Sequence, residues 1–153
     1  MGMKDLIIDI RHIGIIVKDA KKSTNIFKNL FDVEDDEILI VPTEVTLGGS
    51  IYSFIPVGGT ELELIEPISE DFKELLGNPV DGINHIAFTV KDIEEAVTLM
   101  KKKGVRLGHV SKDGILDMKR SKVAYFNPED TDGILIEFIE PKEGMEDAIL
   151  MAS

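Results

Sequence analysis

Two histidines and two glutamates stand out in the sequence because the spacing within each His–Glu pair is nearly the same. His12 precedes Glu63 by 51 residues, and His85 precedes Glu137 by 52. The surrounding runs are rich in Leu, Ile and Phe, where an unpaired carboxylate is costly to bury. Imidazole nitrogens and carboxylate oxygens suit divalent transition metals. The four residues are therefore candidate ligands of one divalent ion, with Co, Zn, Ni, Mn and Fe(II) all open.

The segments that carry these residues are similar to each other. HIGIIVKDAKKSTNIF (12–27) aligns with HIAFTVKDIEEAVTLM (85–100) at an offset of 73. ELIEP (63–67) aligns with EFIEP (137–141) at an offset of 74. A near-constant offset across two separate segments indicates two copies of one structural unit.

The repeat predicts one α+β domain, 1–153, made of two tandem βαβββ modules. The expected first module, linker, second module and C-terminal tail are 10–67, 68–82, 83–141 and 142–153. The predicted strands, from their β-rich runs, are 12–17, 37–41, 51–56 and 61–66 in the first module and 85–90, 105–110, 123–127 and 134–140 in the second.

A helix is predicted after the first strand of each module. Asp19 and Asp92 stand at N-cap positions, and Gly104 is a suitable C-terminal stop. Apolar residues at helical intervals indicate the buried faces. They are Ala20, Ile26, Phe27 and Leu30 in the first helix and Ile93, Ala96, Val97 and Met100 in the second.

Strand periodicity predicts which side chains share a face with the histidines. Side chains alternate along a strand, so His12 shares a face with Gly14 and Ile16, and His85 with Ala87 and Thr89. If a pseudo-two-fold axis relates the modules, the two His–Glu pairs gather on one face of a mixed sheet. The glutamates outside this set are expected on solvated faces; they are Glu61, Glu66 and Glu140.

Composition restricts the class of protein. The chain has 153 residues, no cysteine and a net charge of −12. The lack of cysteine excludes disulfides, thiolate metal sites and cysteine nucleophiles. The negative charge disfavours nucleic acid, and no apolar run approaches the roughly 18 residues of a membrane span. With no signal-peptide pattern at the N-terminus, we expect a cytosolic protein that binds neither nucleic acid nor membrane.

One stretch of the chain is basic. Residues 101–122 contain eight Lys or Arg and only two acids. Such a patch is either a solvated surface or a contact for an anionic small molecule, and both interpretations stay open. Lys119, Arg120 and Lys122 are the candidate substrate contacts. His109 has no counterpart in the first module, so we expect it at the surface or at a pocket rim.

The four-residue pattern and its flanking segments resemble the vicinal oxygen chelate superfamily, which includes glyoxalases, bleomycin resistance proteins and extradiol dioxygenases. Within it, the chain looks most like methylmalonyl-CoA epimerase-like proteins. The segments that carry this likeness are GGTELELIEP, GINHIAFTVKDIEEAVTLMKKKGVRL and KVAYFNPEDTDGILIEF. The resemblance implies paired modules forming a cupped sheet around the metal, and it allows a homodimer. His12, His85 and Glu137 match the metal positions of the epimerases, and Glu63 stands where they carry Glu or Gln.

The resemblance implies a metal-dependent isomerase or epimerase that moves a proton next to a thioester carbonyl. Epimerisation needs an acid and a base on opposite faces of the planar intermediate, and the pseudo-symmetric Glu137 and Glu63 are the candidate catalytic carboxylates. The substrate would be a small molecule, expected to be a thioester, with CoA, glutathione or another carrier open. Three alternatives stay open: a glyoxalase I-like lactoylglutathione lyase, an extradiol dioxygenase, and a non-enzymatic binding protein. The first shares the His, Glu, His, Glu ligand order.

The sequence also departs from the epimerase pattern. Those enzymes carry a second catalytic glutamate on the third strand of the first module, where this chain reads GGSIYSFIPV without a carboxylate. Glu44 lies several residues earlier. The arginine pattern that glyoxalase I uses for glutathione is not evident either.

Overall fold

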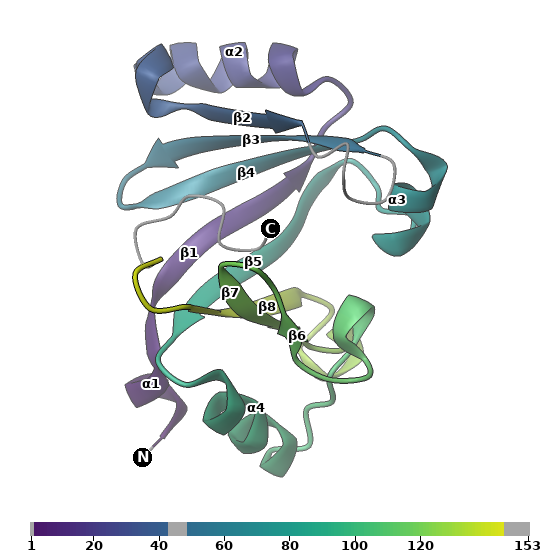
Figure 1. Cartoon of the computed structure of the whole chain (residues 1–153). Helices are drawn as coiled ribbons and strands as arrows, with labels where there is room; N and C mark the ends of the chain where they lie inside the picture. Colours follow the sequence, from purple (N-terminus) through teal and green to yellow (C-terminus); the bar gives the residue numbers. More distant parts are fainter. Residues whose placement is uncertain (1, 43–48, 146–153) are drawn as a thin grey trace. The chain divides into compact units, whose positions relative to one another are not determined.

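The computed structural model describes residues 2–42 and 49–145 (Figure 1). The chain is α+β, as predicted, and its described strands form one mixed eight-stranded sheet in the order β2-β3-β4-β1-β5-β8-β7-β6. The strands are β1 Ile7–Ile16, β2 Leu39–Pro42, β3 Ser50–Val57, β4 Thr60–Pro67, β5 Gly82–Val90, β6 Leu116–Asp117, β7 Ser121–Tyr125 and β8 Leu135–Pro141. The helices are α1 Met3–Leu6, α2 Ala20–Phe31, α3 Glu70–Leu75 and α4 Ile93–Lys102. Short 3₁₀ turns lie at η1 Asp35–Glu37, η2 His109–Ser111 and η3 Pro128–Asp130.

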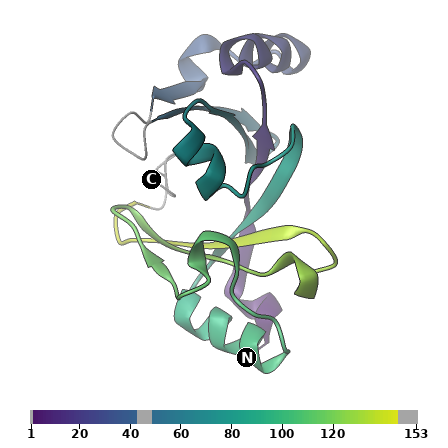
Figure 2. The same ribbon diagram turned by 90° about the vertical axis from the view of Figure 1, so that its right-hand side faces the viewer.

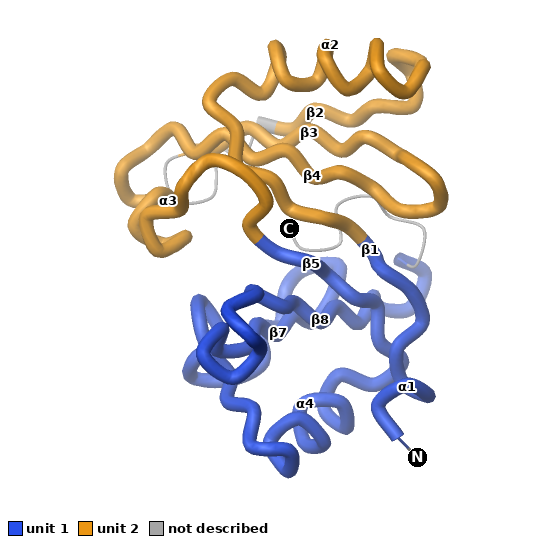
Figure 3. Tube along the Cα trace, turned by 180° about the vertical axis from the view of Figure 1, so that it is seen from behind, with its two compact units in different colours: residues 1–11, 85–153 blue, residues 12–84 orange. Residues whose placement is uncertain are grey.

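The contacts within the chain divide it into two compact units (Figure 3). Unit 1 contains residues 1–11 and 85–153, and unit 2 contains residues 12–84. The divisions fall inside β1 and β5. Each unit repeats the βαβββ-like pattern of the other, which is the arrangement that the duplicated sequence predicts.

Unit 2 is built on the second part of β1. This strand pairs in parallel with β4, and β4, β3 and β2 follow as antiparallel neighbours. Helix α2 packs on β3 and β4 (Figure 1). Val33, Ile55 and Leu64 form a buried apolar cluster in this unit.

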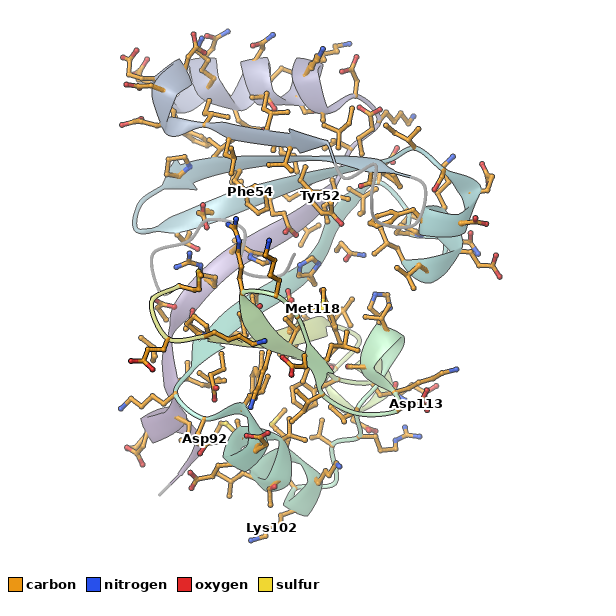
Figure 4. All side chains as sticks on the ribbon, in the orientation of Figure 1. Tyr52, Phe54, Asp92, Lys102, Asp113 and Met118 are labelled. Carbon is orange, nitrogen blue, oxygen red and sulfur yellow. The ribbon has the colours of Figure 1, made fainter. Side chains whose placement is uncertain are left out.

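Unit 1 repeats these pairings with different residues. β5 pairs in parallel with β8, and β8, β7 and β6 follow as antiparallel neighbours. Helix α4 packs on β7 and β8 (Figure 2). In Figure 4, Asp92 marks the start of α4 and Lys102 its end. The core beneath the helix is larger than in unit 2; its buried residues include Leu6, Val90, Ile93, Val97, Phe126 and Phe138.

The two helices begin as predicted. Asp19 accepts a hydrogen bond from the backbone N–H of Lys22, and Asp92 accepts one from Glu95, each at 3.0 Å. These bonds satisfy N–H groups that have no partner within the helix. Gly104, with φ of 85°, follows α4 where a stop was expected.

Two predicted solvated glutamates prove to be structural. Glu66 is half-buried, and its carboxylate accepts the backbone N–H of Ala20 at 2.7 Å. Glu140 is also half-buried and accepts the N–H of Ile93 at 2.9 Å. Both hold the first residue of a helix to the last part of a strand. Glu61 is half-buried as well, so none of the three lies on a fully solvated face.

Other sequence predictions were wrong in detail. Residues 105–110 form no strand; only Leu107 makes an isolated bridge, to Phe126, and η2 follows. Ile26 and Leu30 are exposed, because α2 buries Ala20 and Thr24 instead. The linker expected at residues 68–82 contains helix α3 and the start of β5, and its bounds stay a prediction.

None of the helices in the described part of the chain has the length and hydropathy that crossing a membrane would need.

Candidate metal centre

His12 and Glu63 lie together in unit 2. On the paired strands β1 and β4, His12 stands opposite Glu61 and Gly14 stands opposite Glu63. The side chains of His12 and Glu63 are about 95% buried, and the distance from His12 Nε2 to Glu63 Oε1 is 3.5 Å. A parallel ladder between two adjacent strands thus brings an imidazole and a carboxylate together.

His85 and Glu137 repeat this arrangement in unit 1. On β5 and β8, His85 stands opposite Leu135 and Ala87 stands opposite Glu137. His85 is buried, Glu137 has no exposed surface, and His85 Nε2 lies 3.3 Å from Glu137 Oε1. The register is therefore the same in both units, with each glutamate opposite the residue two positions after the histidine.

The predicted alternation of side chains is confirmed on both histidine strands. Gly14 and Ile16 are buried with His12, and Ala87 and Thr89 are buried with His85. Gly14 and Ala87 place no more than a methyl group two positions after each histidine on the same face of the strand.

Three of the four predicted ligands form one buried group. Each of His12, His85 and Glu137 offers one ligand atom, and these atoms lie within 4.8 Å of one another. Two atoms bound to one ion at about 2.1 Å are separated by about 3.0 Å at octahedral and about 3.4 Å at tetrahedral angles. These separations lie within the 4.8 Å limit of the group, so the group is consistent with a divalent metal site.

The chemistry of the donor set supports the same conclusion. A carboxylate as deeply buried as that of Glu137 costs several kcal/mol unless a cation or hydrogen bonds offset the loss of water. Neutral imidazoles cannot supply a positive charge, whereas a divalent ion can. Glu63 is not part of the three-residue group, although its carboxylate lies against His12.

The structure adds two residues near the second His–Glu pair that the sequence did not single out as a set. Tyr125 on β7 stands opposite Glu137 on β8, and its ring centroid lies 5.9 Å from that of His85. His109 is half-buried, with its ring 5.0 Å from that of Tyr125. Phe54 is the counterpart of Tyr125, because it stands opposite Glu63 on β4. Only the strand pairing reveals this correspondence.

Burial also affects the protonation of His109. It lowers the pKa of this imidazole below its usual value. The His109 imidazole is therefore favoured in its neutral form.

The candidate substrate contacts lie on the β6–β7 hairpin, which carries Met118 in Figure 4. Lys119 is exposed and Arg120 is half-buried in the turn between the two strands. Lys122, on β7, forms an ion pair with Glu94 at 3.3 Å, and this contact raises the pKa of Lys122. Glu44, considered above as a second carboxylate, lies outside the described residues.

The family model of the Glyoxalase/Bleomycin resistance protein/Dioxygenase superfamily matches residues 11–125. The chain belongs to this superfamily. The match includes His12, Glu63 and His85 and ends before Glu137. Glu137 is instead identified as the equivalent of Glu63 by the strand register that the two units share.

Curated relatives include several epimerases. Human mitochondrial methylmalonyl-CoA epimerase is 28% identical over 131 residues, covering 84% of this chain and 71% of that protein. Ethylmalonyl-CoA/methylmalonyl-CoA epimerase of Cereibacter sphaeroides is 29% identical over 133 residues, covering 84% and 94%.

Solved structures agree on the fold. A hypothetical protein of Bacillus halodurans matches with a TM-score of 0.71 at 28% identity, covering 88% of this chain and 94% of that one. A Streptomyces coelicolor methylmalonyl-CoA epimerase variant in complex with 2-nitronate-propionyl-CoA matches with a TM-score of 0.70, covering 90% and 96%. At 22% identity, that second likeness supports the fold alone.

Proposed function

We propose that this protein is a divalent-metal-dependent epimerase or isomerase that moves a proton next to the carbonyl of an acyl-CoA thioester, as in methylmalonyl-CoA epimerases. The observation that carries the proposal is the buried group of His12, His85 and Glu137. The curated relatives named as epimerases support the reaction class.

The proposed metal ligands are His12, His85 and Glu137, with Glu63 as the fourth. When bound, a divalent ion supplies a Lewis acid that stabilises the negative charge developing on the thioester oxygen. The two imidazoles contribute neutral nitrogen donors. Their burial limits the access of bulk water, which would otherwise compete with the substrate oxygen for the ion.

Proton transfer is assigned to the two carboxylates. Epimerisation needs one group to remove the α-proton and another to return a proton to the opposite face of the planar intermediate. Glu63 and Glu137 are proposed for these roles because each lies in the same register beside a histidine. They would replace the third-strand glutamate of the epimerase pattern, which is absent from β3.

The β6–β7 hairpin is proposed to contact the phosphates of the CoA moiety. Lys119 and Arg120 are the stronger candidates, because the ammonium group of Lys122 is paired with Glu94. We further expect a cytosolic protein, and a homodimer remains compatible with the sequence. Both are expectations from composition and family resemblance.

The test is deuterium incorporation into methylmalonyl-CoA in D₂O, followed by mass spectrometry with protein reconstituted with Co²⁺ or Zn²⁺. Wild-type protein should label the α-carbon, and Glu137→Ala and Glu63→Ala should each reduce the rate by at least about 100-fold, the scale of a lost general acid or base. Glu74→Gln, at an exposed position on α3, is the control. Labelling that is unchanged in both alanine variants would refute the assigned carboxylates.

A glyoxalase I-like activity is the second candidate, favoured by the presence of four His and Glu residues in the ligand order of those enzymes. The hemithioacetal of methylglyoxal and glutathione tests it directly. Turnover of that substrate without exchange of methylmalonyl-CoA would assign the chain to this class. Oxygen uptake with catechols would indicate the dioxygenase alternative, and metal-free protein with no activity would indicate a binding protein.

A further inference from the structure

The segment that follows α4 is fixed onto strand β7. Gly108 donates its N–H to the carbonyl of Tyr125 at 3.0 Å, and Asn127 donates to the carbonyl of Arg106 at 2.8 Å. The hydroxyl of Ser111 is buried; it donates to the Tyr125 carbonyl at 2.9 Å and accepts the Tyr125 N–H at 2.6 Å. Residues 106–111 are thus held at several points to one short stretch of strand.

Gly108 shows how close this approach is. A Cβ at this position would lie 2.7 Å from Asn127 Cα and 2.9 Å from Asn127 N. Only glycine lets the two backbones come so near. The close contact sets where the next residue, His109, can stand.

His109 is held in an unfavourable backbone conformation. Its φ is 54°, in the left-handed region that most L-residues avoid. Such a conformation persists only where surrounding contacts impose it, and it occurs preferentially at functional sites. Here the imposing contacts are those of Gly108 and Ser111 with β7.

The His109 side chain extends the cluster around the second His–Glu pair. Its ring packs edge-on against Tyr125, and Tyr125 packs edge-on against His85. Tyr125 also stands opposite Glu137 in the β7–β8 ladder. Within the described residues, the ring nitrogens of His109 form no hydrogen bond, and the residue is half-buried, so a ligand can reach it.

We infer that His109 is a substrate-contacting residue, which donates a ring N–H to an oxygen of the acyl thioester bound beside His85 and Glu137. The inference rests on the proposed function. A neutral imidazole has one donor and one acceptor nitrogen, which suits a carbonyl or carboxylate oxygen. The lowered pKa of His109 keeps the ring in this neutral form near pH 7.

His109→Asn removes the imidazole and keeps a residue that tolerates positive φ. Asp132→Asn is the matched control, because Asp132 also has positive φ (59°) and is exposed. We would measure the dissociation constant of 2-nitronate-propionyl-CoA by calorimetry and the KM and kcat of methylmalonyl-CoA exchange. Loss of one hydrogen bond predicts binding that is weaker by about three- to tenfold, whereas the control should bind as wild type does.

A second measurement follows the His109 ring by NMR in wild-type protein, and the His109→Asn variant serves only to assign the signal. The chain has only three histidines, so protein labelled with ¹³C-histidine and loaded with Zn²⁺ gives three ring Cε1–H signals. The signal that disappears in His109→Asn belongs to His109, and it should shift when the nitronate ligand is added to wild-type protein. The melting temperature of His109→Asn shows whether weaker binding reflects misfolding.

The outcomes separate the two proposals. If wild-type protein binds the ligand and exchanges the proton, but His109→Asn binds within twofold and the His109 signal stays in place, the inference about His109 is wrong and the proposed function stands. If wild-type protein neither binds the ligand nor exchanges the proton, the proposed function fails and the inference falls with it.

Discussion

Glu140 accepts a hydrogen bond from the backbone N–H of Ile93 at 2.9 Å and so joins the end of β8 to the first residue of α4. Glu66 makes the same bond to Ala20 in the other unit, at 2.7 Å. Each glutamate follows a candidate metal-site glutamate by three residues. Both units thus use one carboxylate near the end of the strand to fix the helix, and an earlier carboxylate beside the histidine.

Removing this tether should destabilise the fold without altering the metal site. Because the bond is charge-assisted and half-buried, Glu140→Ala is expected to lower the free energy of unfolding by about 1–2 kcal/mol. Glu140→Gln keeps an acceptor oxygen, so it should lower the free energy of unfolding by a smaller amount. Urea unfolding checks both values, and a Glu140→Ala midpoint equal to that of wild type would show that the bond contributes nothing.

Gly108→Ala should destabilise the protein through steric overlap. The added methyl would meet the Asn127 backbone, and relief requires the 106–111 segment to move away from β7. Overpacking of this kind costs about 1–3 kcal/mol. The expected result is a lower urea midpoint together with a shifted His109 ring signal in NMR spectra. Lys103→Ala, at an exposed position nearby, is the control; an unchanged His109 signal in Gly108→Ala would show that Gly108 does not position this residue.

Asp130 should make part of the stability dependent on pH. Hydrogen bonds from Arg106 hold the pKa of Asp130 below its usual value of 3.8. The Asp130 carboxylate therefore takes up a proton less readily in the native state than in the unfolded state. The stability that it contributes is complete above its usual pKa and is lost as the pH falls through the lowered pKa. The melting-temperature difference between wild type and Asp130→Asn should be constant above about pH 5 and should shrink below pH 4. A difference that grows on acidification would contradict this assignment; Asp132→Asn serves as the exposed control.

Glu63 and Glu137 should differ in their effects on metal affinity. Glu137 belongs to the three-residue group and Glu63 does not, so Glu137→Gln should weaken Zn²⁺ binding more than Glu63→Gln. We expect a loss of about 10- to 100-fold for Glu63→Gln, as for a weaker fourth ligand, and a greater loss for Glu137→Gln. Competition with a chelator of known affinity measures both. Equal losses would make Glu63 as strong a ligand as Glu137, and a smaller loss for Glu137→Gln would reverse the proposed order.

The sequence predicted which residues of the two units are equivalent better than it predicted the helices and strands around them. The offset of 73–74 residues is enough to pair His12 with His85 and Glu63 with Glu137, because duplicated strands keep the same register. The strand expected at 105–110 did not form. Val105, Leu107 and Val110 favour a strand, but the bonds that Gly108 and Ser111 make to β7 turn the chain instead.

Tertiary contacts explain the other differences. Helical periodicity could not show that α2 buries Thr24, whose hydroxyl donates to the Ala20 carbonyl and accepts from the Ser53 hydroxyl on β3. Nor could it show that Ile26 and Leu30 point away from the strands. The proximity of His109 and Tyr125 to His85 depends on cross-strand pairing, which no local pattern encodes.

Calorimetric titration of chelator-treated protein with Zn²⁺ or Co²⁺ tests the central claim most directly. Wild-type protein should bind one equivalent of metal, and His12→Ala and His85→Ala should each bind far more weakly. Glu74→Gln should match wild type. Failure of wild-type protein to bind either metal, or undiminished binding in both histidine variants, would contradict the claim that His12, His85 and Glu137 hold a metal ion.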